Sequence, residues 1–309
     1  MAEPQLLDSS DMARFVADGY LLMESVVPDE INRQFMDDIG YLPDDEITDP
    51  RAYYGKLMMT SSIPRVRAGT PLDHAYPASG AIANLLALPR VRGAILSLVG
   101  ESPVVDHHFL HVTFPPRFYE SSDKPQVSQH THQDSTIDPR MAFDIQLMYF
   151  PHEVTVPMGG TRFVPGSHLR IVSNSAIGRY QNIKGQRHVV CPAGSLLVLH
   201  MGIWHGGGLN TSDRLRYMFK IRLCPTERQC RLWDDSDLPN DHYEQRAIFW
   251  TDPGEARDSL HAILMKPQGW YEYDTGRLEL MNRVKLWRYL LGDEDFDADY
   301  WLTRVENEY

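Results

Sequence analysis

The sequence predicts a mainly β fold with flanking helices, built around a jelly-roll or sandwich core. Short runs of β-branched and aromatic residues, separated by Gly and Pro, follow one another after Gly100. Such closely spaced runs are typical of sandwiches and barrels. Helix-type periodicity is found near the two ends of the chain instead. A length of 309 residues is enough for one large hydrophobic core, so we expect a single domain over 1–309.

The composition argues against several classes of function. The 42 acidic side chains exceed the 30 Lys and Arg, and the resulting formal charge of −12 argues against binding to nucleic acid. No apolar run of about 18 residues is present, so no membrane-spanning helix is expected. The N-terminus lacks a basic segment followed by an apolar one, which argues against a signal peptide. Three cysteines without metal-type spacing fit a reducing compartment, and we expect a cytoplasmic protein.

Residues 1–100 combine helical segments with an irregular stretch that forms a rim. Ser10 and Asp11 are typical of a helix cap and Gly19 of a helix end, whereas prolines interrupt the pattern over 40–77. The expected elements are a helix over 10–19, a strand over 20–23, a helix over 28–39 and one long helix over 79–98.

Residues 101–225 carry the expected β core, and residues 226–309 form an aromatic-rich C-terminal extension. Large aromatic side chains bury much area, so this extension fits a lid, a buttress of the core or the arm of a homodimer. A helix is expected over 276–291. The expected strands are 104–114, 143–150, 162–164, 188–191, 195–200 and 217–223.

A histidine and an aspartate one residue apart, His132 and Asp134, form the first candidate metal-binding pair. In an extended segment, side chains two positions apart point to the same side, so both can hold one ion. The same spacing also occurs by chance, and a polar surface loop is the alternative for this pair alone.

His205 is the second candidate. It follows a buried-strand pattern and precedes three glycines, which permit a close approach of the backbone. An incidental histidine in a strand-ending turn is the alternative. Two histidines and one carboxylate, with the other positions left to water, form the facial triad of non-haem Fe(II) oxygenases. A closed structural zinc site would need four ligands, usually including sulfur.

Two arginines, Arg214 and Arg216, open the next expected strand. The planar fork of a guanidinium matches the two oxygens of a carboxylate, so either arginine could hold an acidic co-substrate. They share one face of an ideal strand, and this spacing does not choose between them. A solvated charge or an ordinary ion pair is the alternative.

Four stretches together resemble the phytanoyl-CoA dioxygenase family of Fe(II)- and 2-oxoglutarate-dependent oxygenases. They follow one another in the family's order and span about residues 10–220. The stretches are 15–20 in the first helix, the dyad 132–134, the turn and strand 158–168, and the distal block 193–216.

The resemblance implies a cupin-like double-stranded β-helix that holds Fe(II) through His132, Asp134 and His205. It also implies 2-oxoglutarate as co-substrate and O2 as oxidant. By the same resemblance, Arg216 is expected to bind the far carboxylate of 2-oxoglutarate, and Gln133 aligns with a position near the co-substrate.

Further positions follow from the same resemblance. Phe150 aligns with an aromatic residue that contacts 2-oxoglutarate. Gly207 stands where the family often has a serine, and Thr113 or Thr161 could supply that missing hydrogen bond. Gly159 and Gly160 replace an acidic residue and an asparagine, in a turn that is expected to be structural.

The implied reaction is hydroxylation, or a related oxidation, of a C–H bond in a small-molecule metabolite or natural-product intermediate, with release of succinate and CO2. Halogenating relatives have a small residue in place of Asp134, so halogenation is disfavoured. A non-enzymatic cupin-type binding protein and a zinc-dependent isomerase or hydrolase are the alternatives. The co-substrate arginine argues against the binding protein, which has no need of it.

Other histidines receive structural interpretations. His168 lies in a Pro-Gly-Ser-His turn, and a structural role is favoured over metal ligation. His107, Phe109 and His111 alternate on one strand face, so one or two of them could reach a substrate cavity.

Overall fold

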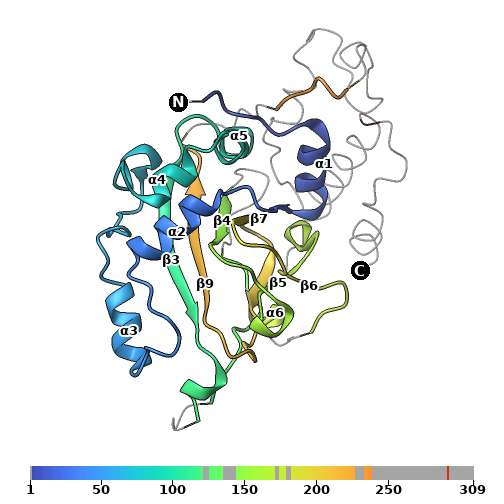
Figure 1. The fold of residues 1–309 in the computed structure, drawn as a ribbon. Coiled ribbons are helices and arrows are strands. Elements are labelled where there is room, and N and C mark those ends of the chain that lie inside the picture. The colour runs from blue at the N-terminus through green and yellow to red at the C-terminus, as the bar shows by residue number, and fades with distance from the viewer. Residues whose placement is uncertain are drawn as a thin grey trace, which may run out of the picture.

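Two antiparallel sheets dominate the computed structural model, which describes residues 2–120, 125–134, 144–170, 174–178, 182–226, 233–238 and 291. The larger sheet has the strand order β1-β7-β4-β9-β3-β2 and the smaller one β6-β5-β8 (Figure 1). The strands are β1 (Tyr20–Met23), β2 (Thr70–Pro71), β3 (Val104–Thr113), β4 (Ile145–Phe150), β5 (Thr161–Val164), β6 (Arg187–His188), β7 (Ser195–His200), β8 (Trp204–Gly207) and β9 (Arg216–Cys224).

Helices from the N-terminal region lie beside the larger sheet (Figure 1). The α-helices are α1 (Ser9–Asp18), α2 (Asp29–Asp38), α3 (Pro50–Leu57), α4 (Ala81–Leu86), α5 (Pro89–Leu98) and α6 (Asn174–Ile177). Short 3-10 turns occupy Leu72–His74, Pro116–Phe118, Val156–Met158 and Ser167–Leu169. This arrangement confirms the prediction of a mainly β core with helices beside it.

Strand alternation divides the hydrophobic core into two clusters. On β4, Leu147 and Tyr149 join the cluster that contains the N-terminal helices. Met148 and Phe150 point the other way and share a cluster with Phe163 of the smaller sheet. Because successive side chains of a strand point to opposite faces, the larger sheet is apolar on its helix side and on part of its inner side.

The first helix and strand follow the prediction closely. The cap of α1 is Asp8, whose carboxylate accepts a hydrogen bond from the Asp11 N–H at 2.7 Å, two residues before the predicted start. Gly19 ends the helix at φ 74°, in the left-handed region that glycine tolerates. A Cβ at Gly19 would lie 2.5 Å from the His168 ring, so both backbone and packing require glycine here.

The single helix predicted over 79–98 is wrong, because two helices, α4 and α5, occupy that stretch. Pro89 lacks an N–H and keeps Leu88 extended, so a new helix begins at the proline. The stretch predicted to be irregular contains α3, which begins at Pro50 behind the Asp49 cap. Asp49 accepts hydrogen bonds from two N–H groups of the first turn.

Two strand predictions also need correction. The strand expected over 188–191 is only β6 (Arg187–His188), and Cys191 instead forms an isolated bridge with Val154. The residues around His205, where no strand was expected and a strand-ending turn was the alternative, form strand β8 and pair with β5. The helix predicted over 276–291 lies outside the described residues, apart from Leu291.

The described part of the C-terminal extension lies against the N-terminus. Trp233 is buried, and its indole N–H donates to the Ser9 hydroxyl at 3.0 Å. The Asp234 N–H donates to the Leu7 carbonyl at 2.8 Å. This segment therefore buttresses α1. Within the described residues, no helix combines the length and the apolar character needed to cross a membrane.

His168 is a buried structural histidine, as its turn motif indicated. Its Nε2–H donates to the Val16 carbonyl at 3.0 Å, and burial lowers the pKa of the ring to about 4. The unfolded chain therefore takes up a proton near pH 6.5, whereas the folded chain takes it up only near pH 4. The stability that the neutral ring supports is present above pH 6.5 and is lost as the pH falls toward 4.

We expect this single group to lower the free energy of unfolding by about 2 kcal/mol between about pH 7.5 and about pH 5. His168→Gln removes the titrating ring. Over the same interval, the unfolding free energy of this variant should therefore fall by about 2 kcal/mol less than that of the wild type. Urea unfolding at the two pH values measures this difference. The exposed His74 is the matched control, and His74→Gln should retain the full wild-type loss. Equal pH dependence in His168→Gln and the wild type would contradict the prediction.

Candidate metal centre

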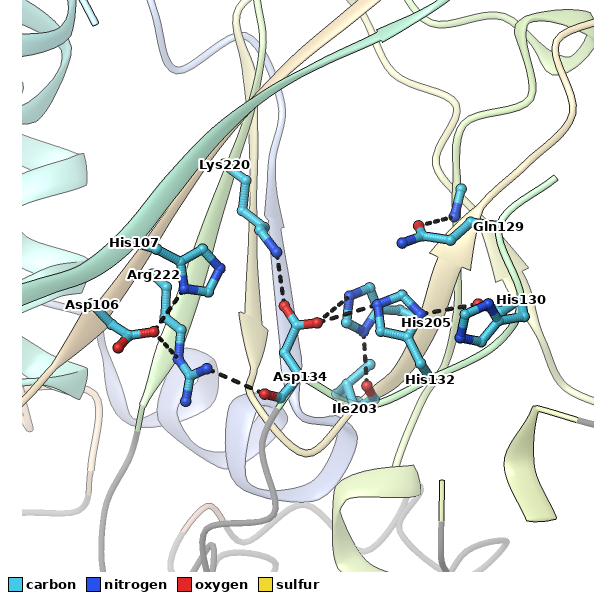
Figure 2. Close-up of polar contacts among 11 residues, drawn as sticks. Asp106, His107, Gln129, His130, His132, Asp134, Ile203, His205, Lys220 and Arg222 are labelled. Atoms are coloured by element: carbon cyan, nitrogen blue, oxygen red, sulfur yellow. Dashed lines mark hydrogen bonds and ion pairs between the residues drawn. The ribbon is translucent and has the colours of Figure 1, made fainter. Parts of the chain in front are cut away.

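The structure brings His132, Asp134 and His205 together (Figure 2). His132 and His205 form an antiparallel bridge, with N–H···O distances of 2.9 and 2.8 Å between their backbones. Asp134 Oδ1 lies 3.2 Å from His132 Nε2 and 3.9 Å from His205 Nε2. One ligand atom from each of the three residues falls within 4.8 Å of the others.

Backbone contacts orient both imidazole rings. His132 Nδ1 lies 2.9 Å from the His130 carbonyl, and His205 Nδ1 lies 2.9 Å from the Ile203 carbonyl. A carbonyl can only accept, so each Nδ1 carries a proton, and each Nε2 is the nitrogen left to bind a metal ion beside Asp134. This is the tautomer that a metal ion requires, and such outer hydrogen bonds are usual for ligating histidines.

The electrostatics also suit a cation. Burial lowers the pKa of His205 to about 4, which keeps this ring neutral at physiological pH. Burial alone would raise the pKa of Asp134, but the hydrogen bond to His132 and the charges of His205 and Lys220 hold it well below its usual range. Burial lowers the pKa of His132, but the hydrogen bond and charge of Asp134 outweigh it and leave the pKa above its usual value, so a metal ion that binds here displaces a proton from this ring. An ionised carboxylate and neutral imidazoles are the forms that bind a metal.

The donor set fits a divalent ion of the iron type. Among the described residues, the three side chains form a cluster of two nitrogens and one carboxylate, without a fourth protein ligand. Such a set leaves coordination positions for small molecules, unlike the closed four-ligand sites of structural zinc.

Arg216 is the second feature of this site. It opens β9, is 4% exposed, and donates to the Thr113 hydroxyl at 2.8 Å and to the Gly159 carbonyl. Burial lowers its pKa to about 10, so it remains charged at neutral pH. No carboxylate of the described residues lies within 4.0 Å of it. Arg214 is exposed, so of the two arginines only Arg216 faces the interior.

Arg216 and the metal cluster lie on the same side of the larger sheet. A Cβ at Gly207, two residues beyond His205, would lie 3.8 Å from Arg216 Nη2. His111 stands near both features: burial, together with the charges of Lys220 and Arg216, lowers its pKa to about 3. Gln129 holds this end of β8, because its side-chain oxygen accepts from the Gly207 N–H at 3.0 Å.

The remaining predicted site residues have different surroundings. Thr113 is in contact with Arg216, as described, whereas Thr161 is buried in β5 opposite Gly207. Phe150 is fully buried in a cluster with Met218, two residues beyond Arg216. Gln133 is half-buried between the two predicted ligands. The co-substrate contacts assigned to Gln133 and Phe150 stay predictions.

The turn at Gly159 has more than a structural role. Its φ of 62° turns the chain so that its carbonyl accepts from Arg216. A Cβ there would lie 2.0 Å from the Leu209 carbonyl oxygen. A turn expected to be only structural thus helps to hold the arginine.

Sequence reasoning missed Lys220 and Arg222. Lys220 Nζ lies 2.8 Å from Asp134 Oδ2, and Arg222 donates to the Asp134 backbone carbonyl at 3.2 Å (Figure 2). The sequence did contain a signal for them, because basic and apolar residues alternate along β9. Positions 216, 220 and 222 are basic and share one face, whereas the opposite face carries Tyr217, Phe219, Ile221 and Leu223.

An antiparallel β fold that carries an open cluster of two histidines and one carboxylate is the arrangement of the non-haem iron oxygenases. The chain belongs to the phytanoyl-CoA dioxygenase family, whose model matches residues 15–218. Members of this family use Fe(II), 2-oxoglutarate and O2.

Similar proteins were found among curated sequences and solved structures. The uncharacterized protein Rv1501 of Mycobacterium tuberculosis is 29% identical over 135 residues, which cover 43% of this chain and 47% of that protein. The chain therefore aligns with about half the length of this relative. The non-haem alpha-ketoglutarate dependent carbocyclase SnoK from nogalamycin biosynthesis has a TM-score of 0.51 at 18% identity, covering 73% of this chain and 88% of SnoK. HygX from Streptomyces hygroscopicus, solved with nickel and 2-oxoglutarate, has a TM-score of 0.49 at 14% identity over 70% of this chain and 87% of HygX.

Proposed function

We propose that the protein is an Fe(II)- and 2-oxoglutarate-dependent dioxygenase, with His132, Asp134 and His205 as the metal ligands. The observation that carries the proposal is the open three-residue cluster beside Arg216, a buried cation with no carboxylate partner among the described residues. The dianion 2-oxoglutarate supplies both a metal-chelating end and a carboxylate for that arginine. We also propose that the two sheets form the double-stranded β-helix of cupin-like proteins.

The bound metal supplies the redox chemistry that couples decarboxylation of 2-oxoglutarate to oxidation of the substrate. The chain's own residues position the reactants. Arg216 and Thr113 fix the far end of 2-oxoglutarate through a charge-assisted contact, and the left-handed turn at Gly159 fixes Arg216. Burial of the arginine strengthens this contact, since the effective dielectric constant inside a protein is lower than in water.

The substrate is proposed to be a small-molecule metabolite or natural-product intermediate, oxidised at a C–H bond by hydroxylation or a related reaction. Asp134 occupies the position that a halide would need, so no halogenated product is expected. A single domain over 1–309, a cytoplasmic location and a homodimer stay predictions from the sequence.

The first test is anaerobic addition of Fe(II) followed by 2-oxoglutarate, observed by visible absorption. A weak metal-to-ligand charge-transfer band should form in the wild type and be lost in His132→Ala. A folded, iron-loaded protein that forms no band would contradict the proposal and favour a cupin-type binding protein. Strict dependence of turnover on O2 and 2-oxoglutarate separates the dioxygenase from a zinc isomerase or hydrolase.

A further inference from the structure

The two carboxylate oxygens of Asp134 have different partners. Oδ1 faces the histidines, at 3.2 Å from His132 Nε2 and 3.9 Å from His205 Nε2. Oδ2 accepts a hydrogen bond from Lys220 Nζ at 2.8 Å. Figure 2 shows the lysine reaching the carboxylate from the side away from the imidazoles. One oxygen is therefore directed toward the metal position, and the other is occupied by a cation of the protein.

Lys220 is buried on a strand that is paired on both sides. It lies in the middle of β9, is 8% exposed, and stands in register with Phe109 of β3 and Met148 of β4. Pairing on both sides fixes the backbone of Lys220, and burial restricts its side chain, so a turn of Asp134 away from this geometry would break the contact with the ammonium. The Lys220–Asp134 contact therefore fixes the orientation of the carboxylate rather than adapting to it.

Arg222 supports the same aspartate from the next inward-facing position of β9. It donates to the Asp134 backbone carbonyl at 3.2 Å, and its guanidinium forms ion pairs with Asp106 at 3.3 Å and Asp144 at 3.5 Å. Two acidic partners neutralise Arg222, whereas Lys220 has one acidic partner, Asp134, in the part of the chain that the structure describes. When Asp134 binds a metal ion, the charge of Lys220 is directed into the site.

We propose that Lys220 is a positioning residue that keeps Asp134 a one-oxygen ligand and leaves the metal free to take an anionic chelating co-substrate. This inference rests on the proposed function, in that the cluster holds a metal. A carboxylate that binds through one oxygen leaves more coordination positions open than one that binds through two. A lysine beside a divalent ion repels the ion and attracts a dianion, so it weakens metal binding and strengthens binding of 2-oxoglutarate.

The test measures two dissociation constants in the full-length protein under anaerobic conditions. Co²⁺ serves as the metal probe through its visible absorption, and 2-oxoglutarate is then added to the Co²⁺-loaded protein. In Lys220→Met we expect Co²⁺ to bind about tenfold more tightly and 2-oxoglutarate about tenfold more weakly, on the scale typical of residues that contact metal ligands. Lys220→Arg retains a cationic donor and should move both constants back toward the wild type. The exposed Lys56 is the matched control, and Lys56→Met should leave both constants unchanged.

The opposite signs distinguish positioning from support of the fold. A Lys220→Met protein that binds both Co²⁺ and 2-oxoglutarate more weakly, or that binds both as the wild type does, would overturn the inference. Lys220→Gln removes the charge with a polar side chain and gives the same comparison if the Met variant does not fold. A wild type that binds Co²⁺ but not 2-oxoglutarate would contradict the proposed function, and the Co²⁺ constants would still decide whether Lys220 restrains Asp134.

Discussion

Asp134→Ala is expected to abolish metal-dependent turnover and to destabilise the fold. The substitution removes one of three proposed protein ligands, so metal affinity should fall by more than about a hundredfold, beyond the effect typical of residues that only contact a ligand. Turnover should fall by about a thousandfold or more, since bound metals contribute several kcal/mol to catalysis. Lys220 would lose its carboxylate in a buried position, a change that typically costs about 3–5 kcal/mol.

The double variant Asp134→Ala/Lys220→Met separates these two effects. Removing the lysine as well eliminates the unpaired charge, so the double variant should recover most of the unfolding free energy while metal affinity stays low. Urea unfolding measures the first quantity, and equilibrium dialysis against Co²⁺ measures the second. Wild-type Co²⁺ affinity in the single variant would show that Asp134 is not a ligand.

The proposed metal ligands could be found from the sequence because their signals are local. His132 and Asp134 are two positions apart, and an extended segment places both on one side. His205 follows a strongly apolar strand and precedes glycines that allow a close approach to the neighbouring segment. The structure shows that approach: a Cβ at Gly206 would lie 2.8 Å from the His130 carbonyl oxygen. Their convergence depends on the bridge between His132 and His205, which the spacing of each motif alone does not give.

The supporting residues depend on the pairing of strands that are distant in sequence. Lys220 is 86 residues from Asp134, and nothing in its immediate sequence indicates a carboxylate partner. The choice of Arg216 over Arg214 likewise depends on which of the two begins β9 on its inner face. The division at Pro89 is different, because the proline was visible in the sequence, whereas the apolar periodicity of both flanking segments favoured one continuous helix.

Arg216→Met is expected to raise the KM for 2-oxoglutarate about a hundredfold while changing Co²⁺ affinity little. Charge-assisted hydrogen bonds contribute about 1.5–3 kcal/mol, and breaking a buried charged pair costs about 2–5 kcal/mol. The free energy that corresponds to a hundredfold rise in KM lies within both ranges. The fold should tolerate the change, because the guanidinium contacts a hydroxyl and a carbonyl rather than a carboxylate among the described residues. Methionine has an apolar stem similar to that of arginine, so Arg216→Met removes a binding group without leaving an unpaired charge.

Two further variants make the Arg216 prediction specific. Arg216→Lys retains the charge but loses the planar fork, so its KM for 2-oxoglutarate should lie between those of the wild type and Arg216→Met. Arg214→Met applies the same substitution two residues away, at an exposed side chain, and should leave the KM unchanged. Initial rates of succinate release at varied 2-oxoglutarate concentration measure all three. Only Arg216 faces the interior beside Thr113. An equal rise in KM for Arg214→Met and Arg216→Met would therefore indicate that the overall positive charge near β9, and not the buried guanidinium, attracts the co-substrate.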